Sequence, residues 1–409
     1  MHRPDEVTQS HQETRRTVCI FAGYYWLVSV AIAAFAPYIG VYFFELGYSA
    51  TRIGILTSIG PFVAILTQPL WGAFGDRSRQ RKRALQTALI GALIASGLYL
   101  VHDHFVFVFA VTGLYMAFSQ AFRPLHDSMI LDYLQNTRYS FAPIRLAGTI
   151  GFSLMTLAGG AIIGDRVKTI FPLHAALLAL TVIMTCLFPR VANDRRVPRR
   201  TGFKKLLSHR FVCFVYTYCL LLYIAFGFHA SFLPVYMRDL GMSNADVGLA
   251  IGLGALSEIP VLLVIERLIR RYGAPWMLIG AGGLTAVRML AYGYGTSVAI
   301  FAAAQLMQGV TLIAAYYCAV TILNDAVPRN LKSTAHAFLA IIVSGFARIA
   351  GSMGGGAIAD ALGLERNFLI SFWIVSVATG AGAVYVRHIT QRHDSRYSSA
   401  RSTGRQTAL

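Results

Sequence analysis

Eight ionisable residues stand inside long apolar stretches of this 409-residue chain. Each charge held at the centre of a bilayer costs at least ~2.5–3.5 kcal/mol, so its presence needs a reason. A carboxyl group in such surroundings can take up and release a proton, and a guanidinium group can bind an acidic solute. The eight residues are Arg123, His126, Asp127, Asp132, Arg145, Glu258, Arg288 and Arg348, with His174 and His229 as weaker members of the set.

Glu258 and Arg288 lie in neighbouring apolar runs and are placed to face one another. A carboxyl group balanced between desolvation and a nearby cation can load and release a proton. The alternative is a permanent ion pair that only holds two helices together. Arg123 and Asp127 are four residues apart and share one helix face, either as part of a binding site or as a self-neutralising pair.

The arginines outnumber the carboxylates in these apolar runs, which favours an anionic ligand. Arg348 has no acidic residue within a helical turn, so it pairs across helices, binds a solute or faces a water-filled cavity. Arg145 flanks a short turn opposite Asp132, with an interfacial ion pair as the alternative to solute binding. Gln308 and Tyr316 share one apolar run and His229 stands in another, and these polar groups line a cavity or join helices.

The composition requires a bilayer around these residues, because 56% of the chain is hydrophobic and only 13% is charged. Continuous apolar runs of about 20 residues indicate spanning helices rather than strands. The sequence therefore predicts an all-α membrane protein with twelve transmembrane helices. The predicted spans are 17–44, 53–75, 84–101, 105–132, 143–163, 170–188, 211–237, 246–265, 276–294, 298–323, 334–358 and 367–388.

The net charge of +18 is concentrated in alternate loops. This positive-inside pattern predicts that both termini are cytoplasmic and that the protein lies in a cell membrane, as in a bacterial inner membrane. It argues against nucleic acid as a partner. The five cysteines stand in apolar runs without metal-binding spacing, so we expect neither metal nor cofactor.

One segment of the chain is repeated. Residues 45–49 (Glu-Leu-Gly-Tyr-Ser) correspond to residues 239–243 (Asp-Leu-Gly-Met-Ser), and Gly54 and Gly60 correspond to Gly248 and Gly254 at the same offset. The duplication predicts two pseudo-symmetric six-helix bundles, 1–189 and 211–389. A cytoplasmic linker at 190–210 joins them, and a disordered cytoplasmic tail follows at 390–409. Repeats related in this way place a ligand site at their interface near mid-membrane.

The segment after the second apolar run contains Gly72, Asp76 and Arg77, followed by Arg81 and Lys82. It resembles the loop signature of the major facilitator superfamily, Gly-x-x-x-Asp-Arg-x-Gly-Arg-Lys, with Arg79 at the second glycine. The resemblance implies that the two bundles alternate access to one site. It also implies that Gly72, Asp76 and Arg77 form a cytoplasmic gate.

A narrower resemblance links Asp127, Arg145, Glu258 and Arg288, with their neighbours, to the branch of lactose permease and phenylpropionate permease. In that branch the first two positions help to bind substrate and the last two take part in proton coupling. One departure concerns the tenth span, which holds Tyr316 but no histidine, lysine or glutamate where the branch has ionisable groups.

We therefore expect a monomeric secondary active transporter, not an enzyme. Its partners are a small polar or anionic organic solute, protons and the lipid bilayer, and proton-coupled symport is the expected mode. Proton-driven efflux of hydrophobic compounds is the alternative within transport. A non-transporting receptor on the same fold is the alternative outside it. An integral membrane enzyme would need a metal cluster or an activated nucleophile, and the sequence offers neither.

Overall fold

The computed structural model describes residues 4–77, 81–135, 137–189, 206 and 209–406, and every regular element in these ranges is a helix. The first half contains α1 (Pro4–Phe35), α2 (Ile39–Glu45), α3 (Ala50–Arg77), α4 (Arg81–Leu98), α5 (Phe105–Ser119), α6 (Phe122–Leu134), α7 (Phe141–Ile163) and α8 (Ile170–Thr185). The second half contains α10 (Arg210–Asp239), α11 (Asn244–Tyr272), α12 (Ala274–Tyr294), α13 (Val298–Leu306), α14 (Ala315–Ala326), α15 (Lys332–Ile341), α16 (Ala347–Ile349), α17 (Gly355–Leu362) and α18 (Leu364–Gln406).

Several spans consist of two or more of these helices in line, such as α5 with α6 or α13 with α14. Eleven helical stretches of the described residues are long and apolar enough to cross a membrane. The remaining predicted span is α4, which has 18 residues but begins with Arg81, Lys82 and Arg83. Large apolar side chains stay exposed on the helices, among them Leu263 at 76% and Val384 at 71%, as lipid contact requires. The predicted all-helical membrane fold is confirmed.

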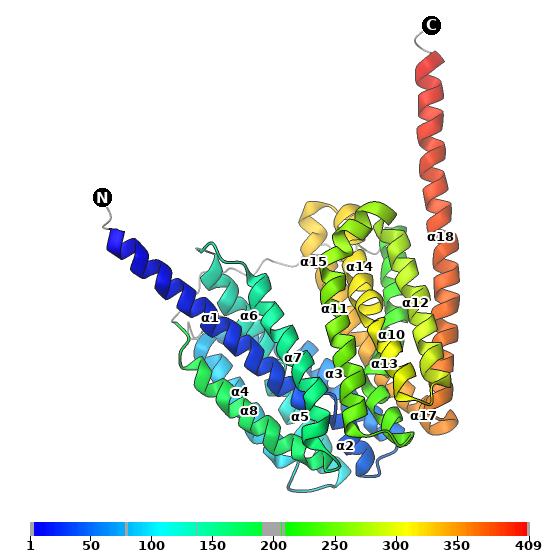
Figure 1. The fold of residues 1–409 in the computed structure, drawn as a ribbon. Coiled ribbons are helices and arrows are strands. Elements are labelled where there is room, and N and C mark those ends of the chain that lie inside the picture. Colours follow the sequence, from blue (N-terminus) through cyan, green and yellow to red (C-terminus); the bar gives the residue numbers. More distant parts are fainter. Residues whose placement is uncertain (1–3, 78–80, 136, 190–205, 207–208, 407–409) are drawn as a thin grey trace.

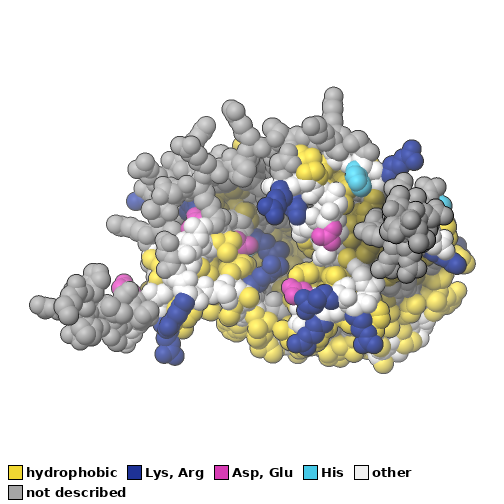
Figure 2. All heavy atoms as spheres, turned by 90° about the horizontal axis from the view of Figure 1, so that it is seen from above, with side chains coloured by type: hydrophobic (Ala, Val, Ile, Leu, Met, Phe, Trp, Pro, Cys, Tyr) yellow, Lys and Arg dark blue, Asp and Glu magenta, His cyan; other side chains and the backbone are white. Residues whose placement is uncertain are grey.

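The helices form two groups that lean against each other at one end and diverge at the other (Figure 1). The beginning of α1 and the end of α18 lie at the diverging end, which we call the terminal side; the opposite end is the far side. Seen from the terminal side, the molecule is hollowed between the two groups (Figure 2). Basic and acidic side chains are visible in and around this hollow, whereas apolar side chains dominate the rest of that view.

The duplicated segment forms the same turn in both halves. Gly47 and Gly241 take positive φ angles of 75° and 81°, a conformation that only glycine adopts at little cost. Each amide bonds a carbonyl three residues back, Gly47 to Phe44 and Gly241 to Arg238, and both distances are 2.9 Å. The shared geometry explains why the glycine occurs in both copies, since it ends one helix and starts the next.

The two halves meet on the far side at two glycine crossings, each defined by a pair of glycines on opposite halves. Gly54 of α3 and Gly356 of α17 form one crossing, and Gly160 of α7 and Gly248 of α11 form the other. A Cβ atom on any of the four would overlap backbone atoms of the facing helix. Glycine is therefore required for this closeness, and the repeated glycine seen in the sequence is one member of each crossing.

Polar contacts reinforce the far side. Asp360 at the end of α17 accepts hydrogen bonds from the first amides of α3, at 2.7 Å from Ala50 N and 2.9 Å from Thr51 N. A carboxylate at this position caps a helix of the other half and interacts favourably with its dipole. Arg238 also reaches Glu45 across the halves at 3.3 Å. The far side is thus closed by backbone contacts and by charges that belong to opposite halves.

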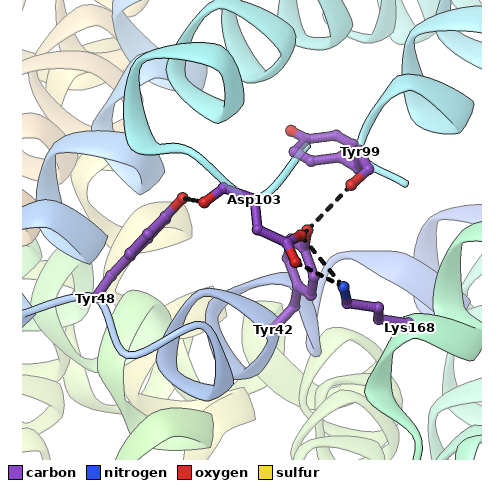
Figure 3. A network of polar contacts seen from close by, with 5 residues as sticks. All are labelled: Tyr42, Tyr48, Tyr99, Asp103 and Lys168. Carbon is purple, nitrogen blue, oxygen red and sulfur yellow. Dashed lines mark hydrogen bonds and ion pairs between the residues drawn. The ribbon is translucent and has the colours of Figure 1, made fainter. Parts of the chain in front are cut away.

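A separate network on the far side ties the first half to itself (Figure 3). Lys168 Nζ lies 2.9 Å from Asp103 Oδ2, and the Tyr42 hydroxyl donates to Asp103 Oδ1 at 3.1 Å. The Tyr48 hydroxyl donates to the Asp103 carbonyl at 2.6 Å, and Tyr42 also reaches the Tyr99 carbonyl. The Lys168 hydrogen bond holds the pKa of Asp103 below its usual range.

Replacing Asp103 with asparagine should flatten the acid dependence of thermal stability. A carboxyl group whose pKa is lowered on folding adds stability above its unfolded value, and this stability is lost as the pH falls through the folded value. The window therefore lies below about pH 4. Because half of the Asp103 side chain is exposed, the loss should stay under about 1 kcal/mol. Melting curves across this range test it, with Asp165→Asn, an exposed acid nearby, as the control; an unchanged acid slope in Asp103→Asn would contradict it.

The sequence predicts a linker before the second half and a disordered tail after it. Almost all of the predicted linker at 190–210 lies outside the described residues. At the other end, the backbone of α18 stays helical to Gln406, whereas the sequence predicts disorder from residue 390. Residues 390–406 contain no proline, so nothing in their backbone chemistry interrupts the helix.

Candidate functional site

Arg288 is the centre of a polar cluster in the second half, and its side chain is fully buried. It donates to the Tyr292 hydroxyl (2.9 Å), the Thr311 hydroxyl (3.0 Å), His229 Nε2 (3.3 Å), Gln305 Oε1 and Gln308 Oε1 (3.0 Å). All five acceptors are uncharged. Because guanidinium only donates, His229 accepts at Nε2 and carries its proton on Nδ1. The cluster therefore holds a buried positive charge by hydrogen bonds to neutral groups.

Gln308 connects this cluster to Glu258. Its amide nitrogen donates to Glu258 Oε1 at 3.0 Å, while its amide oxygen accepts from Arg288. Within the described residues, Glu258 and Arg288 form no direct ion pair, and one glutamine side chain bridges them. The Gln308 side chain thus bridges the two charged groups, because its amide has a donor for the carboxylate and an acceptor for the guanidinium.

Local backbone features explain how Gln308 reaches Glu258. Span ten leaves the regular α-helix at the π-helical segment η2 (Gly309–Ala314). Gly309 packs against the backbone of Ser257, and its amide donates to the Ser257 hydroxyl at 3.0 Å. A single inserted residue of this kind re-aims neighbouring side chains and often marks a functional site.

Asp127 belongs to a polar cluster of the first half. The Tyr25 hydroxyl donates to Asp127 Oδ1 at 2.7 Å, and His126 Nε2 lies 3.2 Å from the same oxygen. Arg123 shares the helix face with Asp127 and interacts with it electrostatically, but its side chain is exposed and forms no ion pair within the described residues. The self-neutralising pair considered as an alternative from the sequence is not formed, and Asp127 instead contacts a tyrosine and a histidine.

Arg145 does not form the interfacial ion pair with Asp132 that was the alternative to solute binding. Asp132 pairs with Arg81 instead, and Arg145 is exposed. Arg145 lies within electrostatic range of Tyr25 in its own half, and of Tyr316 and Glu258 in the other half. Residues of the two halves therefore lie within electrostatic range of one another.

Arg348 contributes a further accessible charge from span eleven. It sits in α16, one short α-helical turn between the π-helical segments η4 (Ile342–Phe346) and η5 (Ala350–Gly354). Its backbone packs against Gly227 of α10, and its charge acts on His229. The side chain is exposed and has no ion-pair partner among the described residues. Of the three readings made from the sequence, accessibility to a cavity or solute agrees best with this placement.

Several residues were placed by the structure in roles that spacing alone does not reveal. Gln305, Thr311 and Tyr25 complete the two clusters. Gln305 and Tyr25 recur at helical spacing with other residues of their runs, whereas Thr311 is marked only by its polarity in an apolar run. Tyr316 is 38% exposed and faces Arg145, as a lining residue would. The side chains of Gly72, Asp76 and Arg77, the expected gate, lie outside the described part of α3. Where side chains are described, no cluster of potential metal ligands occurs.

Two similar halves of membrane-length helices, with charged residues of both halves facing one space, define an integral membrane transport protein. The chain belongs to the MFS_1 like family, whose sequence model matches residues 18–370, and thus to the major facilitator superfamily. Its members are transporters rather than enzymes.

Relatives and solved structures agree with this assignment. The chain is 26% identical over 375 residues to "Uncharacterized transporter YwbF" of Bacillus subtilis, covering 90% of this chain and 92% of the relative. It is 28% identical over 342 residues to the maltose permease of Geobacillus stearothermophilus, covering 81% and 84%. A variant of the nucleoside transporter NupG matches the fold with a TM-score of 0.82 at 15% identity, covering 90% of this chain and 99% of that one.

Proposed function

We propose that the protein is a proton-coupled symporter that moves a small polar or anionic organic solute by alternating access. The observation that carries this proposal is the set of accessible arginines, Arg123, Arg145 and Arg348, which come from both halves and stand without ion pairs among the described residues. Arg123 and Arg145 lie within electrostatic range of Glu258, across the space between the two halves. The glycine crossings close this space on one side.

The distribution of basic loops supports a cytoplasmic location for both termini. With that orientation in a cell membrane, the hollow on the terminal side opens to the cytoplasm and the far side faces outward. The structure then corresponds to the inward-open state of the cycle. Gly72, Asp76 and Arg77 at the end of α3 would close the cytoplasmic side in the opposite state, as their family motif implies, and a single chain would suffice for the cycle.

The arginines favour an acidic group on the solute, because guanidinium groups bind carboxylates through paired charge-assisted hydrogen bonds. Asp127, Gln308 and Tyr316 add acceptors and donors suited to hydroxyl or amide groups. Relatives named as a maltose permease and a nucleoside transporter support a polar organic solute in general. His229 supports the site indirectly, since it is buried behind Arg288.

Glu258 is the proposed proton carrier and Arg288 its positioning partner, in keeping with the resemblance to the lactose permease and phenylpropionate permease branch. Protonation of Glu258 would remove a negative charge that faces Arg123 and Arg145. Loss of that charge would leave the arginines available to an anion, which links proton binding to solute binding. Gln308 takes the bridging place, which explains how span ten serves without an ionisable residue.

A ligand screen followed by vesicle uptake tests the proposal. Sugars, nucleosides and aromatic or aliphatic carboxylates are added to the purified protein, and a ligand of the folded state raises the melting temperature. Reconstituted vesicles should then accumulate that ligand when the outside is made acidic. Binding without any net flux would contradict transport and favour a receptor. Export of hydrophobic compounds driven by the same gradient would favour efflux.

Replacing Arg348 with lysine tests the acidic group. The change keeps the positive charge but removes the planar fork that grips a carboxylate. Affinity for an acidic solute should fall about tenfold or more, since a charged hydrogen bond contributes roughly 1.5–3 kcal/mol. Binding of a neutral competitor should barely change. If all ligands are neutral and Arg348→Lys alters neither binding nor transport, the anionic-solute proposal is wrong.

A further inference from the structure

We propose that His126 and Asp127 form a second proton-binding site, located in the first half and separate from Glu258. The starting point is the unusual environment of His126. Its side chain is only 5% exposed, yet neither ring nitrogen makes a hydrogen bond of acceptable geometry within the described residues. Buried polar groups are nearly always hydrogen-bonded, and each exception calls for an explanation.

Another buried histidine of the same half shows what a structural role looks like. His174 is fully buried, and both of its nitrogens are satisfied, with Nδ1 2.7 Å from the Ala31 carbonyl and Nε2 3.1 Å from the Tyr115 hydroxyl. Its ring also stacks on Phe35 at 4.8 Å. His174 thus joins α1, α5 and α8 as a neutral group. His126 has no such bonds, so fixed helix packing does not account for its polarity.

Asp127 lies close to His126, with its Oδ1 3.2 Å from Nε2. The imidazole is enclosed by the rings of Tyr24 and Tyr25, both edge-on, with centroids at 5.5 and 4.7 Å. Two tyrosine rings give a neutral imidazole little polar compensation, whereas an imidazolium at this distance would form an ion pair with Asp127. Burial disfavours the imidazolium, whereas the adjacent Asp127 carboxylate favours it, so the two effects oppose each other in this pocket.

Asp127 is the more accessible member of the pair. Its side chain is 28% exposed, whereas that of His126 is 5% exposed. The charged and titratable groups that act on the pair are Arg123 from α6 and Tyr24 and Tyr25 from α1, and Arg145 from α7 acts on Tyr25. A proton arriving from the hollow meets the Asp127 carboxylate first and can pass to His126 Nε2 along the 3.2 Å contact. The Tyr25 hydroxyl keeps its bond to the carboxylate throughout.

Loading changes the charge next to the solute site without moving a helix. Before loading, neutral His126 leaves Asp127 as a net negative group beside Arg123. After loading, the imidazolium and the carboxylate form a neutral pair, and Arg123 is no longer offset by Asp127. This matches the effect proposed for Glu258, so each half would carry one proton, and both protons would leave arginines of the first half available to the solute. The inference rests on the proposed transport only for this use of the proton.

Histidine NMR on the full chain in lipid vesicles tests proton binding directly. Protein labelled with ¹⁵N-histidine is measured between pH 5 and 8, and the spectrum of His126→Gln is subtracted to isolate His126, because the ring nitrogens report imidazole and imidazolium separately. We expect an imidazolium signal that grows as the pH falls. In Asp127→Asn the ratio of imidazolium to imidazole at a given pH within the transition should drop about tenfold, since a carboxylate within 4–6 Å typically shifts such an equilibrium by that much or more.

His102→Gln, an exposed loop histidine, is the control, and its subtraction should isolate a signal that Asp127→Asn leaves unchanged. His126→Asn is measured as a second subtraction in case the glutamine variant folds poorly. A His126 ring that stays neutral over the whole range, or titrates equally in Asp127→Asn, would overturn the proposal. If His126 titrates and Asp127→Asn alters its titration, but no solute is transported, the proposed function is refuted and the proton site stands. If the protein transports solute while His126 stays neutral, the proton site is refuted and the proposed function stands.

Discussion

Transport should be arrested when Gly248 is replaced by leucine. A Cβ atom at this position would meet the Thr156 carbonyl and, at 2.6 Å, the Tyr38 hydroxyl. Because the first of these is backbone, α7 and α11 can accommodate the side chain only by moving apart, which opens the far side. Overpacking of this kind costs about 1–3 kcal/mol, so the closed state should become roughly 5- to 100-fold less populated. A carrier that cannot close one side cannot complete its cycle.

Two measurements follow this variant. Vesicle uptake should fall, and a cysteine placed at Thr156 in a cysteine-free background should react with a water-soluble maleimide faster than in the parent. Gly280→Leu in α12 is the matched control, since nothing lies within 4 Å of the corresponding Cβ. Gly54→Leu should repeat the result at the other crossing. Normal uptake by a well-folded Gly248→Leu would mean that closure at this crossing is not part of the cycle.

Glu258→Gln should abolish gradient-driven accumulation while leaving folding and solute binding largely intact. The amide keeps the shape of the carboxyl group, and its carbonyl oxygen can still accept the 3.0 Å hydrogen bond from Gln308. The amide cannot carry a proton, so uphill movement loses its energy source. Exchange of labelled for unlabelled solute at equal concentrations should persist. Uptake driven by a pH gradient at the rate of the parent protein would remove Glu258 from the mechanism.

Arg288→Gln is the informative partner of that variant. Arg288 satisfies five neutral acceptors, and burying acceptors without a donor costs about 1–3 kcal/mol each. We therefore expect Arg288→Gln to lower the melting temperature strongly, whereas Glu258→Gln should not. Equal loss of folding in both variants would indicate a structural unit of the two residues rather than proton coupling.

Much of the architecture was available from the sequence because it depends on composition and repetition. Continuous apolar runs predict helices in lipid. The offset that the pair Gly54 and Gly248 shares with the pair Gly60 and Gly254 predicts a duplicated fold, and both predictions are confirmed. The reason for the repeated glycines could not be read from the chain, because it lies in backbone contacts with Ser352 and Thr156 of the opposite half. Contacts of this kind join residues that no local pattern connects.

The candidate site was predictable residue by residue but not pair by pair. The cost of burying charge singles out Glu258, Arg288 and Asp127 in any apolar run. Their partners depend on helix rotation and on π-helical insertions such as η2, which shift the facing side chain by about one position. Hence Gln308 stands between Glu258 and Arg288, and Arg81 takes the aspartate, Asp132, that sequence proximity would give to Arg145.

The glycine crossings also bear on electrical insulation. Where backbone lies directly against backbone, no side chain can swing aside to admit a file of water molecules, and protons and small ions need such a file to cross. Gly54 with Gly356 and Gly160 with Gly248 would therefore act as a dielectric seal formed by backbone atoms rather than by charged side chains. Vesicles that carry the protein in their membrane, with no solute added, should hold an imposed pH gradient about as long as vesicles without the protein.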